Sequence, residues 1–138
     1  MNTRKGFTLV ELLVVIAILA ILATVSVVGY TAFIQGAEEQ AAITEADQIK
    51  GTIDAGLTLK KYIDINGTVY TRNTSGKLEV YSGDGADDDN TFKATDIDAT
   101  TAAKIKVVKV GGVDTVVYHS GDYHVDLNTG KVVTVNAQ

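Results

Sequence analysis

Acidic side chains gather in one short, glycine-flanked segment in the middle of the chain. Residues 83–90 read GDGADDDN, so four carboxylates and one amide fall within seven residues. Oxygen ligands on a flexible loop suit Ca²⁺, which makes this segment a candidate calcium site. Its candidate ligands are Asp84, Asp87, Asp88, Asp89 and Asn90. Because the spacing does not match an EF-hand loop, a solvated acidic loop is the alternative interpretation.

The two histidines form a second candidate site. If Gly121-Asp122 is a two-residue hairpin turn, His119 pairs with His124 across it, and both share the outer face with Asp126. Two imidazoles and a carboxylate can bind zinc or copper, although such a pair is more often ordinary polar surface.

The remaining composition argues against catalysis. The sequence shows no glycine-rich phosphate loop and no Ser/His/Asp arrangement in a suitable turn context, and it contains no cysteine to serve as a nucleophile. The formal net charge is −5 and no basic stripe is present, so direct nucleic-acid binding is not expected. We therefore expect a non-enzymatic protein that requires no cofactor.

The elements that position these residues begin with an apolar N-terminal segment. From Leu12 to Val28 there are 17 residues without a charge, and the wider run 7–34 contains only Glu11. About 20 apolar residues span a bilayer, and Arg4 and Lys5 would hold the N-terminus on the cytoplasmic side. A small-x-small cleavage site does not follow the apolar core, which disfavours an ordinary signal peptide.

Glu11 is the exception within this apolar run. A carboxylate in a membrane helix costs about 3 kcal/mol, so Glu11 is expected to have a partner or a function. The alternative is that it lies at the interface and reaches water.

The segment Lys5–Leu13, KGFTLVELL, resembles the class III leader and N-methylation site of type IV pilins and of type II secretion pseudopilins. A short basic leader ends in Gly6, Phe7 follows it, and Glu11 is the fifth residue after that point. The resemblance implies that a prepilin peptidase cleaves between Gly6 and Phe7 and methylates the new amine of Phe7. It also implies an assembly role, in which Glu11 pairs with the Phe7 amine of a neighbouring subunit.

Downstream, the periodicity predicts that the helix continues from about Thr8 to Lys60. An apolar stripe recurs at steps of three or four residues, at Ile43, Ala46, Ile49, Ile53 and Leu57. The runs 68–72 and 77–82 read as strands around a turn, and 94–103 is ambiguous, with a short helix capped by Thr95 as one interpretation.

From Lys104 the pattern predicts an antiparallel meander of about four strands. Turns at Gly111-Gly112 and Gly121-Asp122 set the register, and the last strand is expected at 131–135. One apolar face then collects Ile105, Val107, Val116, Tyr118, Val125 and Leu127. The fold class is therefore α+β, with a long N-terminal helix, transmembrane in its first half, packed on a C-terminal antiparallel sheet. This arrangement is similar to the pilin fold.

The expected organisation is a leader over 1–6, an apolar membrane or filament-core helix over 7–34, and a globular head over 35–138. The resemblance implies a type IV pilus subunit for adhesion, motility, biofilm formation or DNA uptake. The alternatives are a pseudopilin of a secretion or competence system and, less favoured, an anchored binding domain that does not polymerise. The implied partners are other copies of the chain, a prepilin peptidase, a platform protein and an assembly ATPase. The implied location is the plasma membrane before assembly, with the head outside, and the extracellular pilus afterwards.

Overall fold

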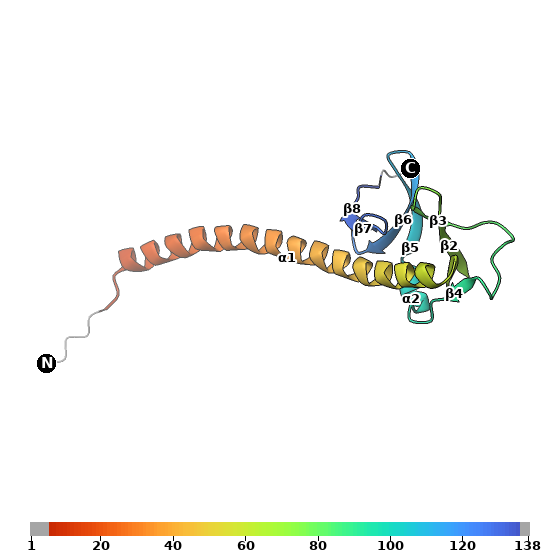
Figure 1. The fold of residues 1–138 in the computed structure, drawn as a ribbon. Helices are drawn as coiled ribbons and strands as arrows, with labels where there is room; N and C mark the ends of the chain where they lie inside the picture. The colour runs from red at the N-terminus through yellow and green to blue at the C-terminus, as the bar shows by residue number, and fades with distance from the viewer. Residues whose placement is uncertain (1–5, 136–138) are drawn as a thin grey trace. The chain divides into compact units, whose positions relative to one another are not determined.

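The computed structural model describes residues 6–135 of the 138-residue chain. The chain divides into two compact units, one up to Glu38 and one from Glu39 onward. A single long helix, α1 (Leu9–Leu59), contributes to both, and all strands belong to the second unit (Figure 1). We call this second unit the head.

Helix α1 starts and ends within a residue of the predicted positions. It runs without interruption through Gly29, Gly36, Gly51 and Gly56. Isolated glycines weaken a helix by about 1 kcal/mol each but do not remove its hydrogen bonds, so the surrounding good helix formers carry it through.

The first sheet of the head contains β1 (Tyr62–Ile65), β2 (Thr68–Arg72), β3 (Leu78–Val80) and β4 (Thr91–Lys93), in the order β3-β2-β1-β4. β1 and β2 form a hairpin whose turn residues, Asn66 and Gly67, both have positive φ. A two-residue turn of this kind matches the right-handed twist of its strands. β4 pairs with β1 in parallel, so this sheet is mixed.

The second sheet is the predicted antiparallel meander. It contains β5 (Ile105–Val110), β6 (Val113–Ser120), β7 (Tyr123–Asp126) and β8 (Lys131–Val132), in chain order. The predicted register is confirmed, since Val110 lies opposite Val113 and His119 opposite His124. The last strand is shorter than expected.

The head core forms where the second half of α1 meets both sheets. Ala42, Ala46, Ile49 and Ile53 are buried on the helix, while Ile43 and Leu57 are only partly buried beside them. The buried face is therefore the predicted stripe, shifted slightly around the helix. The sheets contribute Ile63, Ile65, Tyr70, Leu78, Ile105, Val116, Tyr118, Val125 and Leu127.

Two details of the sequence analysis are corrected. Val107 lies in the predicted register but is 47% exposed, because the apolar face of β5 extends beyond the buried core. The short helix α2 (Ala99–Ala102) is capped by Asp98 rather than by Thr95, and the Asp98 carboxylate accepts a hydrogen bond from the Thr101 N–H. Asp98 directly precedes the helical residues, so it is the side chain placed to reach an unpaired amide.

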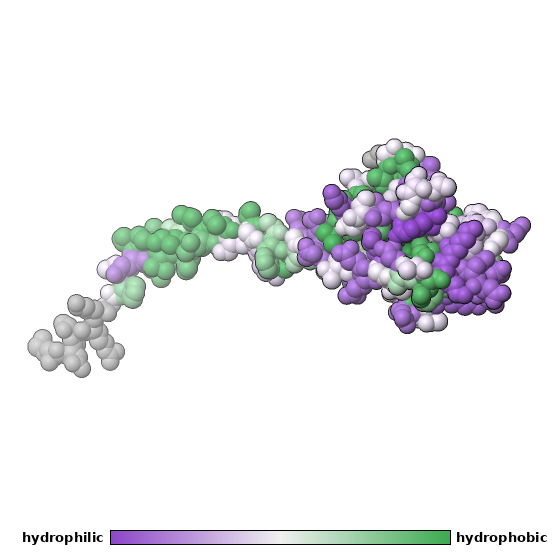
Figure 2. All heavy atoms as spheres, in the orientation of Figure 1, coloured by the Kyte–Doolittle hydropathy of each residue, from purple (hydrophilic) through white to green (hydrophobic). Residues whose placement is uncertain are grey.

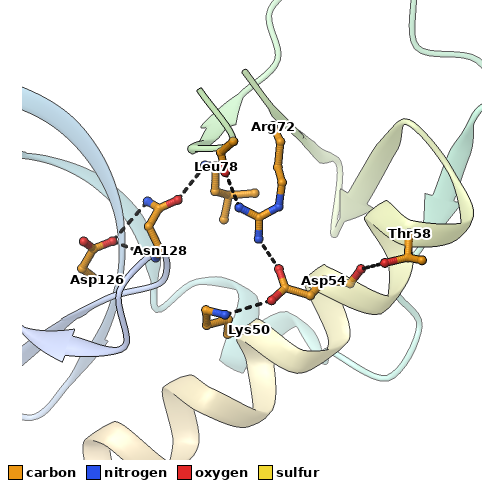
Figure 3. A network of polar contacts seen from close by, with 8 residues as sticks. Lys50, Asp54, Thr58, Arg72, Leu78, Asp126 and Asn128 are labelled. Carbon is orange, nitrogen blue, oxygen red and sulfur yellow. Dashed lines mark hydrogen bonds and ion pairs between the residues drawn. The ribbon is translucent and has the colours of Figure 1, made fainter. Parts of the chain in front are cut away.

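Polar contacts join α1 to the first sheet of the head, and the first sheet to the second (Figure 3). The Asp54 carboxylate forms an ion pair with Lys50, at 2.9 Å from its Nζ, and a second ion pair with the guanidinium of Arg72 in β2. Separately, the Asn128 side chain accepts a hydrogen bond from the Leu78 N–H at 2.6 Å and donates one to Asp126 at 3.1 Å. The network thus fixes α1 against β2, and β3 against the chain that leaves β7.

Candidate assembly site at the N-terminus

The first half of α1 presents an almost continuous apolar surface. Its large side chains are exposed all the way from Phe7 to Phe33, with Phe7 at 83%. In the space-filling view this part of the helix is predominantly hydrophobic, whereas the head shows mixed polarity (Figure 2). By length and composition, α1 is the one helix among the described residues that could cross a membrane. Such a surface needs lipid or protein to cover it.

Thr8 and Glu11 close the first turn of α1 reciprocally. Glu11 Oε2 accepts hydrogen bonds from the Thr8 N–H at 3.1 Å and from Thr8 Oγ1 at 2.9 Å. In return, Thr8 Oγ1 accepts from the Glu11 N–H at 3.3 Å. This is a capping box, in which an N-cap hydroxyl and a glutamate three residues later satisfy two otherwise unpaired amides. It places a negative charge at the positive end of the helix dipole.

The expected cleavage position lies just outside this cap. Gly6, Phe7 and Thr8 are exposed and not helical, and the helix begins at Leu9. A protease acts on exposed backbone outside regular secondary structure, so the Gly6–Phe7 bond is accessible in this structure. Leader residues 1–5 lie outside the described residues.

The capping role of Thr8 was not predicted from the sequence. The signal was present, because Thr8-Leu9-Val10-Glu11 has the capping-box spacing and precedes an apolar helical run.

The acidic loop, residues 83–90, uses several of its polar groups internally. Asp87 Oδ1 accepts from the Asn90 N–H at 3.0 Å, and Asn90 Oδ1 accepts from the Asp87 N–H at 3.0 Å. Asp88 pairs with Lys93 at 2.9 Å, and this hydrogen-bonded ammonium lowers the pKa of Asp88. Among the residues described, no three His, Cys, Asp or Glu side chains converge as metal ligands. The calcium site at Asp84, Asp87, Asp88, Asp89 and Asn90 stays a prediction.

The two histidines are brought together as the register predicted. His119 Nδ1 lies 2.9 Å from His124 Nε2, and the ring centroids are 4.5 Å apart in an edge-on arrangement. Burial has the largest effect on His124 and lowers its pKa, and the nearby charges of His119 and Lys106 lower it further. Asp126 is directed elsewhere, since its carboxylate accepts hydrogen bonds from Asn128 and Thr129.

Comparison with known proteins supports the interpretation of the N-terminus. Residues 1–27 match the family model for the prokaryotic N-terminal methylation motif. A fimbrial protein of Moraxella nonliquefaciens is 47% identical to this chain over 53 residues, which is 38% of this chain and 34% of that relative. The match thus spans about a third of the relative's length. No solved structure matches the chain.

These similarities confirm the type IV pilin resemblance stated from the sequence. The fold agrees, since it combines a long apolar N-terminal helix with a four-stranded antiparallel sheet. Together they support a pilin-type structural subunit and point away from an enzyme.

Proposed function

We propose that this chain is a type IV pilus subunit that polymerises through residues 7–34 into a surface filament. The observation that carries the proposal is the exposed apolar surface of the first half of α1, most of which lies within the match to the N-terminal methylation motif over residues 1–27. Helices of this kind stabilise each other by packing when they leave the membrane, because together they remove their apolar side chains from water.

Glu11 sets the axial register of the proposed filament. Inside an apolar core its carboxylate requires a positive partner, and the amine that cleavage creates on Phe7 of a neighbouring subunit supplies one. Removing one member of a buried ion pair costs about 3–5 kcal/mol, because the other charge is left unpaired. Subunits that dock out of register are therefore disfavoured.

The proposal implies a processing and export route. A prepilin peptidase removes residues 1–6 and methylates Phe7, while 7–34 holds the subunit in the plasma membrane and 35–138 forms the external head. A platform protein and an assembly ATPase then extract the subunit into the fibre. The similarity to a fimbrial protein supports a pilin-type subunit, and a secretion pseudopilin stays the alternative function.

The test is N-terminal mass spectrometry on material sheared from cells that carry a pilus assembly system and express the full chain. We expect a first residue of Phe7 with one added methyl group. Glu11→Gln is the matched variant, since it keeps the side-chain shape but removes the charge; we expect it to be cleaved normally and to be nearly absent from the sheared fraction.

Two results would contradict the proposal. Recovery of chains that still begin at Met1 would show that the motif is not processed. Processed chains that remain in the membrane, for the parent as for Glu11→Gln, would instead indicate a subunit that forms no surface fibre and would favour the pseudopilin function.

A further inference from the structure

We propose that His119 and His124 together bind a divalent transition-metal ion of tetragonal preference, Cu²⁺ or Ni²⁺, on the outer face of the second sheet. The site lies in the head and does not depend on the pilus proposal. The chain contains two histidines and no cysteine, so this pair includes every imidazole and no thiolate competes with it.

The backbone holds the two residues in place from both sides. They are register partners across the tight turn at Gly121-Asp122, and Gly121 has a φ of 57°. Beyond the pair, the His119 N–H donates to the Lys104 carbonyl at 2.8 Å, and the His124 carbonyl accepts from the Val133 N–H at 2.8 Å. Neighbouring chain segments therefore fix both Cα positions, and only the ring torsions remain free to adjust.

The ring separation is closer to that of two neighbouring ligands in a tetragonal site than to that of two ligands in a tetrahedral site. For metal–nitrogen bonds of about 2.0–2.1 Å, two nitrogens at a right angle lie about 2.9 Å apart, whereas tetrahedral ligands lie about 3.4 Å apart. His119 Nδ1 and His124 Nε2 are separated by 2.9 Å. This is the length of their hydrogen bond, and it is also close to the separation of cis ligands in a square-planar or tetragonal site, the geometry typical of Cu²⁺ and Ni²⁺. The rings therefore need to turn, but not to move apart, for such an ion to bind.

Binding requires small local changes. One ring now donates its N–H to the other, so that proton moves to the opposite nitrogen of its ring, and both rings turn to aim their lone pairs at one point beside the present hydrogen bond. Both side chains are half-buried at the surface, which leaves room for this rotation.

Water completes the coordination. The Asp126 carboxylate is held by Asn128 and Thr129, and the Glu45 carboxylate bonds Tyr118 and Ser120, whose positions alternate with His119 along β6. The positive charge of Lys106, which lowers the pKa of His124, also opposes a bound cation. The proposal therefore predicts moderate affinity that rises when Lys106 is neutralised.

The test uses the full chain in detergent, titrated with Cu²⁺ or Ni²⁺ by calorimetry and studied with Cu²⁺ by electron paramagnetic resonance. We expect one ion per chain, with hyperfine coupling to two ring nitrogens. His119→Asn and His124→Asn should each weaken binding at least tenfold. Losing a residue that only hydrogen-bonds a metal ligand already weakens binding by about tenfold or more, so losing the ligand itself should cost at least as much. Lys106→Gln should strengthen it by about two- to fivefold, the value of one nearby solvent-screened charge.

The proposal is overturned if the parent chain shows coupling to fewer than two ring nitrogens, or if the double variant His119→Asn/His124→Asn binds as tightly as the parent. Circular dichroism of each variant establishes that the head is still folded. Should a variant unfold, the nitrogen count of the parent decides the question alone.

Discussion

Thr8 gives the negatively charged Glu11 side chain a hydrogen-bond partner within its own chain. Because Glu11 Oε2 accepts two hydrogen bonds from Thr8, the carboxylate is solvated by protein groups before any neighbouring subunit arrives. In the proposed fibre, the amine of Phe7 would add to or replace these bonds. Glu11 thus caps the isolated helix, and in the proposed fibre it would have a second role in assembly.

Replacing Thr8 tests the first of these roles. We expect Thr8→Ala to destabilise the first turn of α1 by about 1 kcal/mol, because the N-cap hydroxyl is lost. Thr8→Ser keeps the hydroxyl and should behave like the parent. Amide hydrogen exchange of Leu9 to Glu11 in detergent micelles measures the difference; equal protection in Thr8→Ala and the parent would show that the cap contributes nothing.

Asp54 makes the stability of the head depend on pH. Burial opposes its ionisation, but the hydrogen bonds from Lys50 and Arg72 outweigh burial and lower the pKa of Asp54. A carboxyl whose folded pKa is lowered stabilises the fold above its unfolded pKa of about 3.9 and loses that contribution as pH falls through the folded value. Asp54→Asn should therefore melt below the parent at pH 7, and the two melting temperatures should converge under strongly acidic conditions.

The control for this measurement is Asp122→Asn, which changes a carboxylate in the turn that joins β6 and β7. Its melting temperature should stay near that of the parent across the same pH range. If Asp54→Asn follows the parent at every pH, the ion pairs of Asp54 do not stabilise the head.

At the level of elements, two helical glycines have opposite surroundings. A Cβ built at Gly56 would lie 2.7 Å from both Ile63 Cδ1 and Phe92 Cδ1, whereas one at Gly51 meets nothing within 4 Å. Gly51→Ala should stabilise the head by up to about 1 kcal/mol through helix propensity. Gly56→Ala should destabilise it by about 1–3 kcal/mol, since the Ile63 side chain and the Phe92 ring must shift to make room for the added methyl group. Thermal melts of the two variants decide; stabilisation by both would mean that the contact at Gly56 relaxes freely.

The acidic loop carries the calcium prediction. We expect millimolar Ca²⁺, but not Mg²⁺, to raise the melting temperature of the head, because a bound ion stabilises the folded state by mass action. Replacing Asp84 and Asp89 together by Asn should abolish the shift. The absence of any shift in calorimetry of the parent would leave a solvated loop as the interpretation.

The strands and register of the second sheet could be predicted from short-range sequence patterns. In the first sheet, only β2 and β3 were predicted. Gly111-Gly112 and Gly121-Asp122 fix the register of β5, β6 and β7 over short distances. β1 was missed although Asn66-Gly67 is a strong hairpin signal. β4 had no local signal, because its partner β1 precedes it by a long connection and the pairing is parallel.

The candidate sites follow the same division. The segment from Gly6 to Glu11 was recognisable because its motif is contiguous, and the histidine pair followed from a correctly placed turn. The pairing of Asp88 with Lys93 and the capping role of Thr8 depend on side-chain geometry that the pattern alone did not supply.

For the whole molecule, the head should fold without the apolar helix. Its unit from Glu39 onward has its own buried core, built from the second half of α1 and both sheets. We expect a truncated chain that begins at Gln35 to be folded and monomeric without detergent, whereas the full chain requires detergent. Analytical ultracentrifugation and circular dichroism check this, and aggregation of the truncated chain would show that the head has a further apolar surface that needs cover.

The two sheets differ in how far along the chain their partners lie. Each pairing in the second sheet joins successive strands through a short turn. In the first sheet, β1 pairs with β4, and β2, β3 and the acidic loop lie between them in the chain. Closing a short loop costs less entropy and happens sooner than closing a long one. We therefore expect the meander to form its pairings rapidly once its residues are available, and closure of β4 onto β1 to be the slower pairing step within the head, although β4 precedes the meander in the chain.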